Sequence, residues 1–277
     1  MLISEFLGDS VEIHSLGYRT DLLFVRFDGR VEDRGEYIYV ESPKIPTFHW
    51  GNLLLFNQAP VRGDLTRWTS VFKREFAHNP AVRHITLGWD TADGKAGDLS
   101  EFLGAGYKIE EAVVLTTKFV RPPARPNHEV RIRTLATDAD WEATIQCQIA
   151  ARDPMFGLEG YSSFKRAQMA RYRAMVEKGL GLWYGAFLED SLVGDLGVFI
   201  QEGVGRFQSV GTVPEHRGRG ICATLVHEAA RLSLRDHGAR ELVMVADENY
   251  HAARIYESIG FKATRKQYGV CYWKRDA

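Results

Sequence analysis

The sequence predicts an α+β protein built on a mixed, mostly antiparallel sheet flanked by helices. In the second half, three strand-like runs are joined by short turn segments, which favours an antiparallel meander. A helical pattern follows, with apolar residues repeating on one face of residues 221–236. The first half ends with the same succession of strand, helix and strand as the second half. Together these observations indicate two related α+β units in one chain.

Length and composition agree with two globular domains. The chain has 277 residues and a mass of 31.3 kDa. Its length exceeds the roughly 100–200 residues of a typical single domain. Hydrophobic residues make up 45% and charged residues 26%, which predicts a sizeable core. The 35 Lys and Arg residues are balanced by 36 Asp and Glu residues, so the basic excess of a general nucleic-acid or acidic-membrane binder is missing. We therefore expect neither nucleic acid nor a membrane as a partner.

The cysteines and the first residues bear on the compartment. Cys147, Cys222 and Cys271 are odd in number and far apart, so they predict neither a disulfide framework nor a zinc site. The first ten residues lack the basic segment and long apolar run of a signal peptide. No stretch of about 18 apolar residues is present. These features predict a soluble, reduced, cytoplasmic protein without a metal.

A proline-rich segment marks the expected domain boundary. Residues 121–129 contain three prolines within five positions, which keep the backbone extended and exclude it from a helix or a central strand. We expect this segment to link a domain over residues 1–120 to a domain over residues 130–277.

The second domain shows a regular order of predicted elements. A short strand comes first, and a helix begins near Thr137. The predicted ranges are strands at 130–135, 182–188, 192–200, 206–213, 241–246 and 269–273, and helices at 163–178, 221–236 and 250–258. The first domain repeats part of this order, with strands at 50–60, 84–90 and 113–119 and helical segments at 64–76 and 98–107. This predicts an internal repeat of the fold, with chance similarity between two α/β segments as the alternative.

The segment from Val210 to Ala223 carries the first candidate site. It joins a strand to a helix through a loop that contains Gly218 and Gly220. Glycines let the backbone bend closely around a ligand, and the helix that begins at Ile221 adds the positive end of its dipole. Converging amides of this kind suit a diphosphate, whereas an ordinary glycine-rich turn is the simpler alternative.

Three other motifs are weak or excluded. Gly218-x-Gly220-x-x-Ala223 formally fits the dinucleotide fingerprint, but residues 214–217 separate the strand from the first glycine, and the preceding strands look antiparallel. A Walker-type loop needs Gly-Lys-Ser or Gly-Lys-Thr, which the sequence lacks. A zinc-protease helix needs a second histidine four residues after His227, where this chain has Arg231.

The segment from Asn249 to Phe261 carries the second candidate site. Ala252 and Tyr256 lie one helical turn apart on the same face. The small side chain leaves room for a bulky ligand, and the tyrosine hydroxyl can meet its reactive end. Taken alone, Tyr256 is more simply explained as an aromatic residue of the core or its rim.

Together the two motifs resemble those of the GNAT superfamily of acyl-CoA-dependent N-acyltransferases. In that family, Arg/Gln-x-x-Gly-x-Gly/Ala binds the CoA pyrophosphate, and Asn-x-x-Ala-x-x-x-Tyr-Glu-x-x-Gly-Phe supplies a tyrosine. The resemblance covers residues 130–273, with Cys222 where the family prefers Gly or Ala. It implies a tandem protein in which a degenerate, partial GNAT-like domain precedes a catalytic GNAT domain that uses acetyl-CoA as cosubstrate.

The resemblance also implies a role for each motif residue. Main-chain groups of Val210, Gly211 and Thr212 would hold the pantetheine arm, and one of them would polarise the thioester carbonyl. Asn249 would hydrogen-bond the cofactor near its pantetheine, Ala252 would leave room for it to pass, and Tyr256 would protonate the departing thiolate. The expected pyrophosphate loop consists of Arg217, Gly218, Arg219, Gly220, Ile221, Cys222 and Ala223.

The sequence does not fix the base that deprotonates the amine. Asp195, Glu159 and Asp153 lie on segments that face the acceptor side in the GNAT fold, and each is expected to be a solvated surface carboxylate. A chain of water molecules is the alternative base. In the first domain, the loop over residues 60–65 has one glycine, and Asp64 lies where the pyrophosphate would bind. We expect that domain to bind no CoA and to shape the acceptor site or a subunit contact.

The sequence therefore predicts an N-acetyltransferase that moves an acetyl group from acetyl-CoA to a primary amine by direct attack, with Tyr256 as general acid. The acceptor is a small-molecule amine or a protein amine, and a homodimer is a possible assembly. The alternative is a non-catalytic acyl-CoA-binding sensor or scaffold.

Overall fold

The computed structural model describes residues 13–247 and 252–273 of the chain. These residues form two compact units. Unit 1 comprises the described residues of Met1–Glu111 and Lys266–Ala277, and unit 2 comprises those of Ala112–Arg265.

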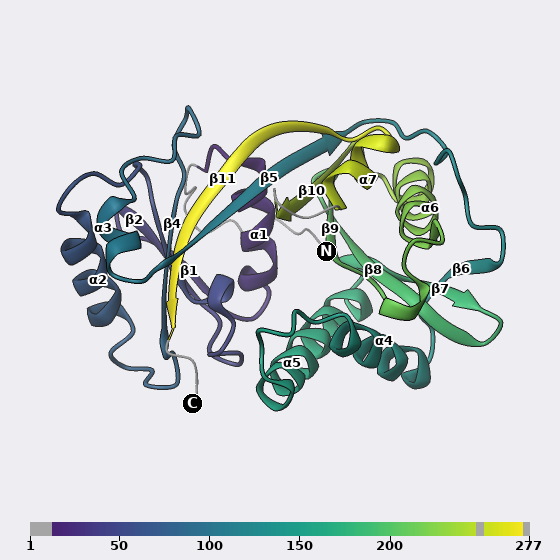
Figure 1. Cartoon of the computed structure of the whole chain (residues 1–277), viewed down its shortest axis with the longest axis horizontal. Helices are drawn as coiled ribbons and strands as arrows, with labels where there is room; N and C mark the ends of the chain where they lie inside the picture. Colours follow the sequence, from purple (N-terminus) through teal and green to yellow (C-terminus); the bar gives the residue numbers. More distant parts are fainter. Residues whose placement is uncertain (1–12, 248–251, 274–277) are drawn as a thin grey trace. The chain divides into compact units, whose positions relative to one another are not determined.

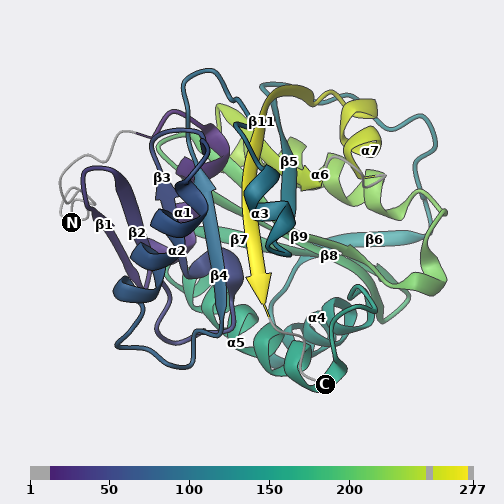
Figure 2. The same ribbon diagram turned by 60° about the vertical axis from the view of Figure 1, so that its left-hand side comes forward.

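In unit 1 the strands follow the order β1-β2-β3-β4-β11, and neighbours pair antiparallel except for β3 and β4, which run parallel (Figures 1 and 2). Its elements are α1 (Leu16–Arg26), β1 (Arg30–Asp33), β2 (Tyr37–Glu41), the 3-10 turn η2 (His49–Gly51), β3 (Leu53–Phe56), α2 (Asp64–Glu75), β4 (His84–Trp89) and α3 (Ser100–Gly104), with parts of β5 (Lys108–Thr117) and β11 (Lys262–Trp273). Successive side chains of β3 point to opposite faces. Leu53 and Leu55 pack with α1, whereas Leu54 and Phe56 pack with α2. Helices on both faces explain why this strand is apolar throughout.

In unit 2 the strands follow the order β5-β10-β9-β8-β7-β6. Strands β7 to β9 form the antiparallel meander that the sequence predicts, and β6 pairs antiparallel with β7. Helices α4 and α5 cover one face of this sheet, and α6 and α7 cover the other (Figure 1). The elements are β6 (Val130–Thr134), α4 (Asp138–Ala150), α5 (Leu158–Glu177), β7 (Gly181–Leu188), β8 (Ser191–Gln201), β9 (Val204–Thr212), the 3-10 turn η3 (Pro214–His216), α6 (Ile221–Asp236), β10 (Glu241–Asp247) and α7 (Ala252–Ser258).

Two strands are exchanged between the halves of the sequence. Strand β5 lies before the proline-rich segment, yet its residues 112–117 pair antiparallel with β10 in unit 2. Strand β11 ends the described chain, yet its residues 268–273 pair antiparallel with β4 in unit 1. The compact units thus divide within β5 and β11. The domain boundary at residues 121–129 stays a prediction made from the sequence.

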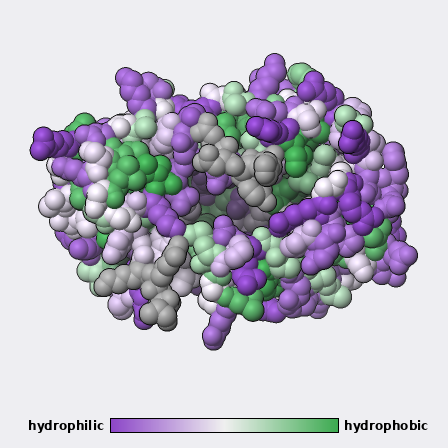
Figure 3. All heavy atoms as spheres, viewed as in Figure 1, coloured by the Kyte–Doolittle hydropathy of each residue, from purple (hydrophilic) through white to green (hydrophobic). Residues whose placement is uncertain are grey.

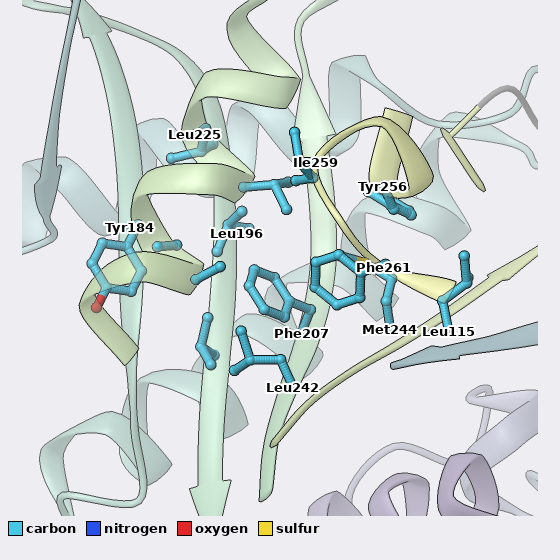
Figure 4. Packing of buried hydrophobic residues seen from close by; sticks show 14 of the residues in the cluster. Leu115, Tyr184, Leu196, Phe207, Leu225, Leu242, Met244, Tyr256, Ile259 and Phe261 are labelled. Atoms are coloured by element: carbon cyan, nitrogen blue, oxygen red, sulfur yellow. The ribbon is translucent and has the colours of Figure 1, made fainter. Parts of the chain in front are cut away.

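The core of unit 2 lies between its sheet and helices α6 and α7. Figure 4 shows Leu225 of α6 above Leu196 of β8, with Phe207 of β9 beside Phe261. The Phe207 and Phe261 rings meet edge to face, with centroids 5.8 Å apart, a favourable arrangement for two aromatic quadrupoles. The apolar face predicted for residues 221–236 is therefore the buried face of α6, and the two ends of this helix agree with the prediction.

Among the other predicted elements, some begin where expected and others begin earlier. Helix α4 begins where expected, because Thr137 and Asp140 form a capping box. Helix α5 begins at Leu158, before the predicted position 163, and β11 begins at Lys262, before the predicted position 269. No element was predicted before residue 50, where the structure has α1, β1 and β2. The predicted α+β class and the mixed, mostly antiparallel sheet are confirmed.

The described helices carry no membrane-spanning segment. None of those within residues 13–247 and 252–273 is both long enough and apolar enough to cross a bilayer. Hydrophilic side chains also dominate the face of the molecule drawn in Figure 3.

Candidate functional site

Strands β9 and β10 pair over a short length and then separate. Their parallel register comprises only three pairs, from Glu241 with Val204 to Val243 with Arg206. Beyond Arg206, β9 continues to Thr212 beside β8, and β10 continues beside β5. Backbone groups on the facing edges of the two strands therefore have no partner strand there in the described part of unit 2. Such edges are strong hydrogen-bonding sites for a ligand that enters between them.

A β-bulge reshapes β9 within this separated segment. Asp195 pairs with Gly211 and Gly197 with Gln208, so Leu196 on β8 faces two residues of β9, Ser209 and Val210. Ser209 has a φ of 51°, in the left-handed region that non-glycine residues rarely adopt. The extra residue changes the pleat of the strand after Ser209. As a result, the backbone of Val210 and Gly211 takes a different direction from that of a regular strand.

The loop after β9 forms the second part of the site. Gly218 and Gly220 have φ values of 77° and 79°, which explains why glycine stands at both positions. Gly220 is the N-cap of α6 and provides no side-chain hydrogen bond. The first amides of a helix have no intrahelical acceptor, so those of Ile221, Cys222 and Ala223 require an outside partner. This arrangement of amides suits an anionic group.

The arginines of the loop differ in their contacts. The Arg217 side chain is exposed, and its Nε donates to the Thr212 carbonyl at 3.2 Å. The Arg219 guanidinium lies 2.5 Å from a Glu129 carboxylate oxygen and 2.9 Å from Nδ1 of His216. Part of the charge of Arg219 is thereby neutralised, whereas Arg217 makes no ion pair in the described part of the chain. Of the two side chains, Arg217 is the better candidate for an anion contact.

The proline-rich segment packs against this loop. A Cβ on Gly220 would lie 2.5 Å from the Arg125 carbonyl oxygen, so no larger residue fits at that position. The Asn127 amide donates to Thr224 Oγ1 at 2.8 Å, within the first turn of α6. Cys222 lies partly buried beside the core, and burial raises the pKa of its thiol to about 11, so it is a neutral, small residue at neutral pH.

Only residues 252–261 of the second motif lie within the described part of the chain. Tyr256 lies on α7, 4% exposed, in the core cluster with Phe261 (Figure 4). This burial fits the simpler explanation of Tyr256 as an aromatic residue of the core. Asn249 lies outside the described residues. Ala252 begins α7, and its side chain is likewise outside the description.

On the α4 and α5 face, a buried carboxylate lies under the bulge. Asp195 is 0% exposed, and its Oδ1 accepts from Gln148 Nε2 at 2.9 Å and from Trp183 Nε1 at 3.0 Å. Its Oδ2 has no hydrogen-bond partner in the described part of the chain. Burial raises the pKa of Asp195 to about 7, although the Cys147 thiol, the hydrogen bonds from Gln148 and Trp183 and the nearby Lys165 ammonium all act in the opposite direction.

The expectation that Asp195 is a solvated surface carboxylate is therefore wrong. Glu159 and Asp153 are exposed, as expected. The sequence contained a signal that could have found Asp195, because a lone acidic residue lies within the apolar run of β8. Gln148 and Trp183 carried no such signal, since they come from α4 and β7 and meet Asp195 only in the folded protein.

The corresponding loop of unit 1 is closed by its own carboxylates. Gly63 is the N-cap of α2, and the Gly63 amide donates to Glu101 Oε2 at 2.9 Å. The Val61 amide donates to Asp64 Oδ2 at 2.9 Å. Strands β3 and β4 also pair to their ends, and the Asp90 amide continues the ladder to the Phe56 carbonyl. In the described part of unit 1, the two strands therefore stay paired at these ends, and the amides of Val61 and Gly63 already have acceptors.

Among the residues that the structure describes, no group of three or more His, Cys, Asp or Glu side chains is arranged to hold a metal ion.

Comparison with known proteins identifies the fold. Residues 183–270, from β7 to β11, match the model of the family described as FR47-like protein. A functionally unknown conserved protein from Staphylococcus epidermidis ATCC 12228 is similar over 92% of this chain and 98% of its own, with 14% identity and a TM-score of 0.71. A GCN5-related N-acetyltransferase from Kribbella flavida is similar over 93% of this chain and 95% of its own, with 14% identity and a TM-score of 0.62.

A tandem GNAT protein from the clavulanic acid biosynthesis pathway is also similar, over 82% of this chain and 81% of its own, with 17% identity and a TM-score of 0.51. No curated protein sequence matches the chain. These findings show that the chain has the fold of GCN5-related N-acetyltransferases, and they confirm the resemblance to that superfamily.

Proposed function

We propose that this protein, which has the GCN5-related N-acetyltransferase fold, transfers an acetyl group from acetyl-CoA to a primary amine. One observation carries the proposal. The separated ends of β9 and β10 lie in the same unit as the amino end of α6, which has no side-chain cap, and the loop after β9 leads directly into α6. A long, flexible thioester with a diphosphate in its middle needs such a combination of open strand edges and free amides.

The residues present fit such a ligand. The amides from Gly218 to Ala223 would hold the pyrophosphate, with the dipole of α6 behind them. Main-chain groups of Val210, Gly211 and Thr212 would bind the pantetheine arm along the open edge of β9. Asn249 and Ala252 complete the proposed site, with roles that rest on the motif.

The chemistry forms a C–N bond and breaks a C–S bond. As the amine attacks, negative charge develops on the carbonyl oxygen, and an amide of β9 near Val210 or Gly211 stabilises it. Tyr256 donates its hydroxyl proton to the departing thiolate, a transfer typically worth about 10²–10⁴ in rate. The proton lost by the amine goes to water or to a carboxylate on the acceptor side.

Gly218 offers the sharpest test of the loop. A Cβ at Gly218 meets nothing within 4 Å, whereas one at Gly220 would collide with Arg125. Gly218→Asp places a negative charge among the loop amides and should weaken acetyl-CoA binding at least about tenfold, because like charges repel strongly across a binding site.

Gly238→Asp is the matched control. Gly238 has a φ of 75°, close to that of Gly218, and also faces open space, so both variants carry the same backbone strain. Calorimetry should show that only the Gly218 variant loses affinity for acetyl-CoA, and equal affinities would contradict the site. A mass-spectrometric screen of small and peptide amines with acetyl-CoA then tests the reaction. Binding without release of CoA in any reaction would favour the non-catalytic sensor.

A further inference from the structure

Gln148 and Asp195 form a buried hydrogen-bonded link from α4 to the bulge of β9. We infer that they are positioning residues for the reaction, which hold the bulged backbone at Ser209 and thereby set the direction of the amides that follow it. This inference rests on the proposed function, because the amides that it concerns are those near the thioester carbonyl.

The link uses both N–H groups of the Gln148 side-chain amide. Its Nε2 donates to the Ser209 carbonyl at 2.7 Å and to Asp195 Oδ1 at 2.9 Å, so both N–H groups have acceptors. Trp183 Nε1 donates to the same carboxylate oxygen, which fixes Asp195 from the side of β7. A donor anchored in this way can hold the Ser209 carbonyl in one orientation.

Ser209 needs such an anchor. A non-glycine residue in the left-handed region persists only where its surroundings determine the conformation. The β8 register shifts at this point, so the ladder alone does not hold Ser209. The Gln148 hydrogen bond supplies the missing constraint from the helix side.

Gly211 shows that the space for Gln148 is kept clear. A Cβ at this position would lie 2.8 Å from Gln148 Nε2 and 3.6 Å from Asp195 Oδ2. Its φ is not positive, so the backbone does not require glycine there. The close approach of the Gln148 amide explains the residue instead.

The surroundings of Asp195 are consistent with a fixed, buried anchor. The Cys147 thiol of α4 lies beside it, and the Lys165 ammonium of α5 is the nearby cation. Lys165 donates to Gln168 Oε1 at 2.7 Å, and it forms no ion pair with Asp195 in the described part of the chain. Asp195 therefore acts through its hydrogen bonds to Gln148 and Trp183.

The test compares Gln148→Leu with Asp195→Asn. Leucine removes the donor to Ser209 and should lower kcat about 10- to 100-fold, while KM for acetyl-CoA changes less than about threefold, because a misplaced catalytic amide affects the reaction more than binding. Asparagine keeps an oxygen acceptor for Gln148 and Trp183, so Asp195→Asn should keep kcat within about threefold of the wild type.

Gln208→Leu is the control, since Gln208 Nε2 donates to Tyr172 Oη at 2.7 Å and joins β9 to α5 before the bulge. This variant should keep kcat. Hydrogen–deuterium exchange over residues 207–213 gives a readout that needs no activity, and it should rise in Gln148→Leu and stay unchanged in Asp195→Asn.

The outcomes separate the inference from the proposed function. Unchanged kcat and exchange in Gln148→Leu would overturn the positioning role. A loss of kcat in Asp195→Asn as large as in Gln148→Leu, without faster exchange, would also overturn it and make Asp195 the proton acceptor. A wild type that acetylates no amine refutes the proposed function alone, and the exchange experiment then still decides whether Gln148 holds the bulge.

Discussion

Replacing Asp195 by asparagine should change how the stability of the protein depends on pH. The folded protein raises the pKa of this carboxyl group from its ordinary value of 3.8 to about 7, because the group is removed from water. Between these two pH values, the folded state binds a proton that the unfolded state has lost. The contribution of Asp195 to stability is therefore fully present below about pH 4 and is lost as the pH rises toward and through 7.

The size of the effect follows from the shift. About three pKa units at about 1.4 kcal/mol each give a total cost of about 4 kcal/mol for ionising the buried group. Part of this cost is already present at pH 5, so about 2–3 kcal/mol of it develops between pH 5 and pH 8. Asparagine does not titrate and carries no such term.

Urea unfolding of the wild type and of Asp195→Asn at a series of pH values measures this difference. Other titrating groups are common to both proteins and cancel when the two free energies of unfolding are subtracted. The asparagine variant should gain about 2–3 kcal/mol relative to the wild type on going from pH 5 to pH 8. A difference that stays constant over this range would refute the argument that Asp195 is desolvated.

Three further predictions follow from the two motifs and the exchanged strands. Tyr256→Phe should lower kcat by about 10²-fold or more. Its affinity for acetyl-CoA should stay close to that of the wild type, because the ring still packs with Phe261. Provided that chemistry limits the rate, unchanged turnover at saturating substrate would make Tyr256 a packing residue. Titration calorimetry should give one CoA per chain, since Asp64 and Glu101 already accept the loop amides of unit 1; two equivalents at saturation would contradict this reading. A fragment of residues 128–277 lacks β5 and so leaves the edge of β10 unpaired, which should lower its solubility or activity; a fragment as soluble and active as the whole chain would show that β5 is dispensable.

The local parts of unit 2 could be predicted from the sequence because neighbouring residues determine them. The periodicity of residues 221–236 places one face of α6 in the core, and the capping box at Thr137 begins α4. Gly218 and Gly220 indicated a tightly bent loop, and the left-handed backbone that they adopt is also a local property of the chain. Each of these features depends on contacts within a few positions of the chain.

The parts that could not be predicted depend on distant residues. The pairing of β5 with β10 and of β11 with β4 leaves no trace in local patterns, since each strand is apolar enough to pair with several others. The hydrogen-bond partners of Asp195 could not be predicted either, because Gln148 and Trp183 lie 47 and 12 positions away in the sequence. The bulge at Ser209 is likewise a property of two strands together.

The exchange of strands also determines when the chain can finish folding. Unit 1 needs β11, whose pairing with β4 joins Trp89 to Tyr268 across about 180 positions, so closing this loop comes late and at a high entropic cost. During synthesis, β4 leaves the ribosome long before β11 does, and the edge of β4 that pairs with β11 stays open until β11 emerges. Unit 2 already has β5 available when β10 emerges. The order of synthesis therefore favours completion of the candidate catalytic unit first, with unit 1 closing last.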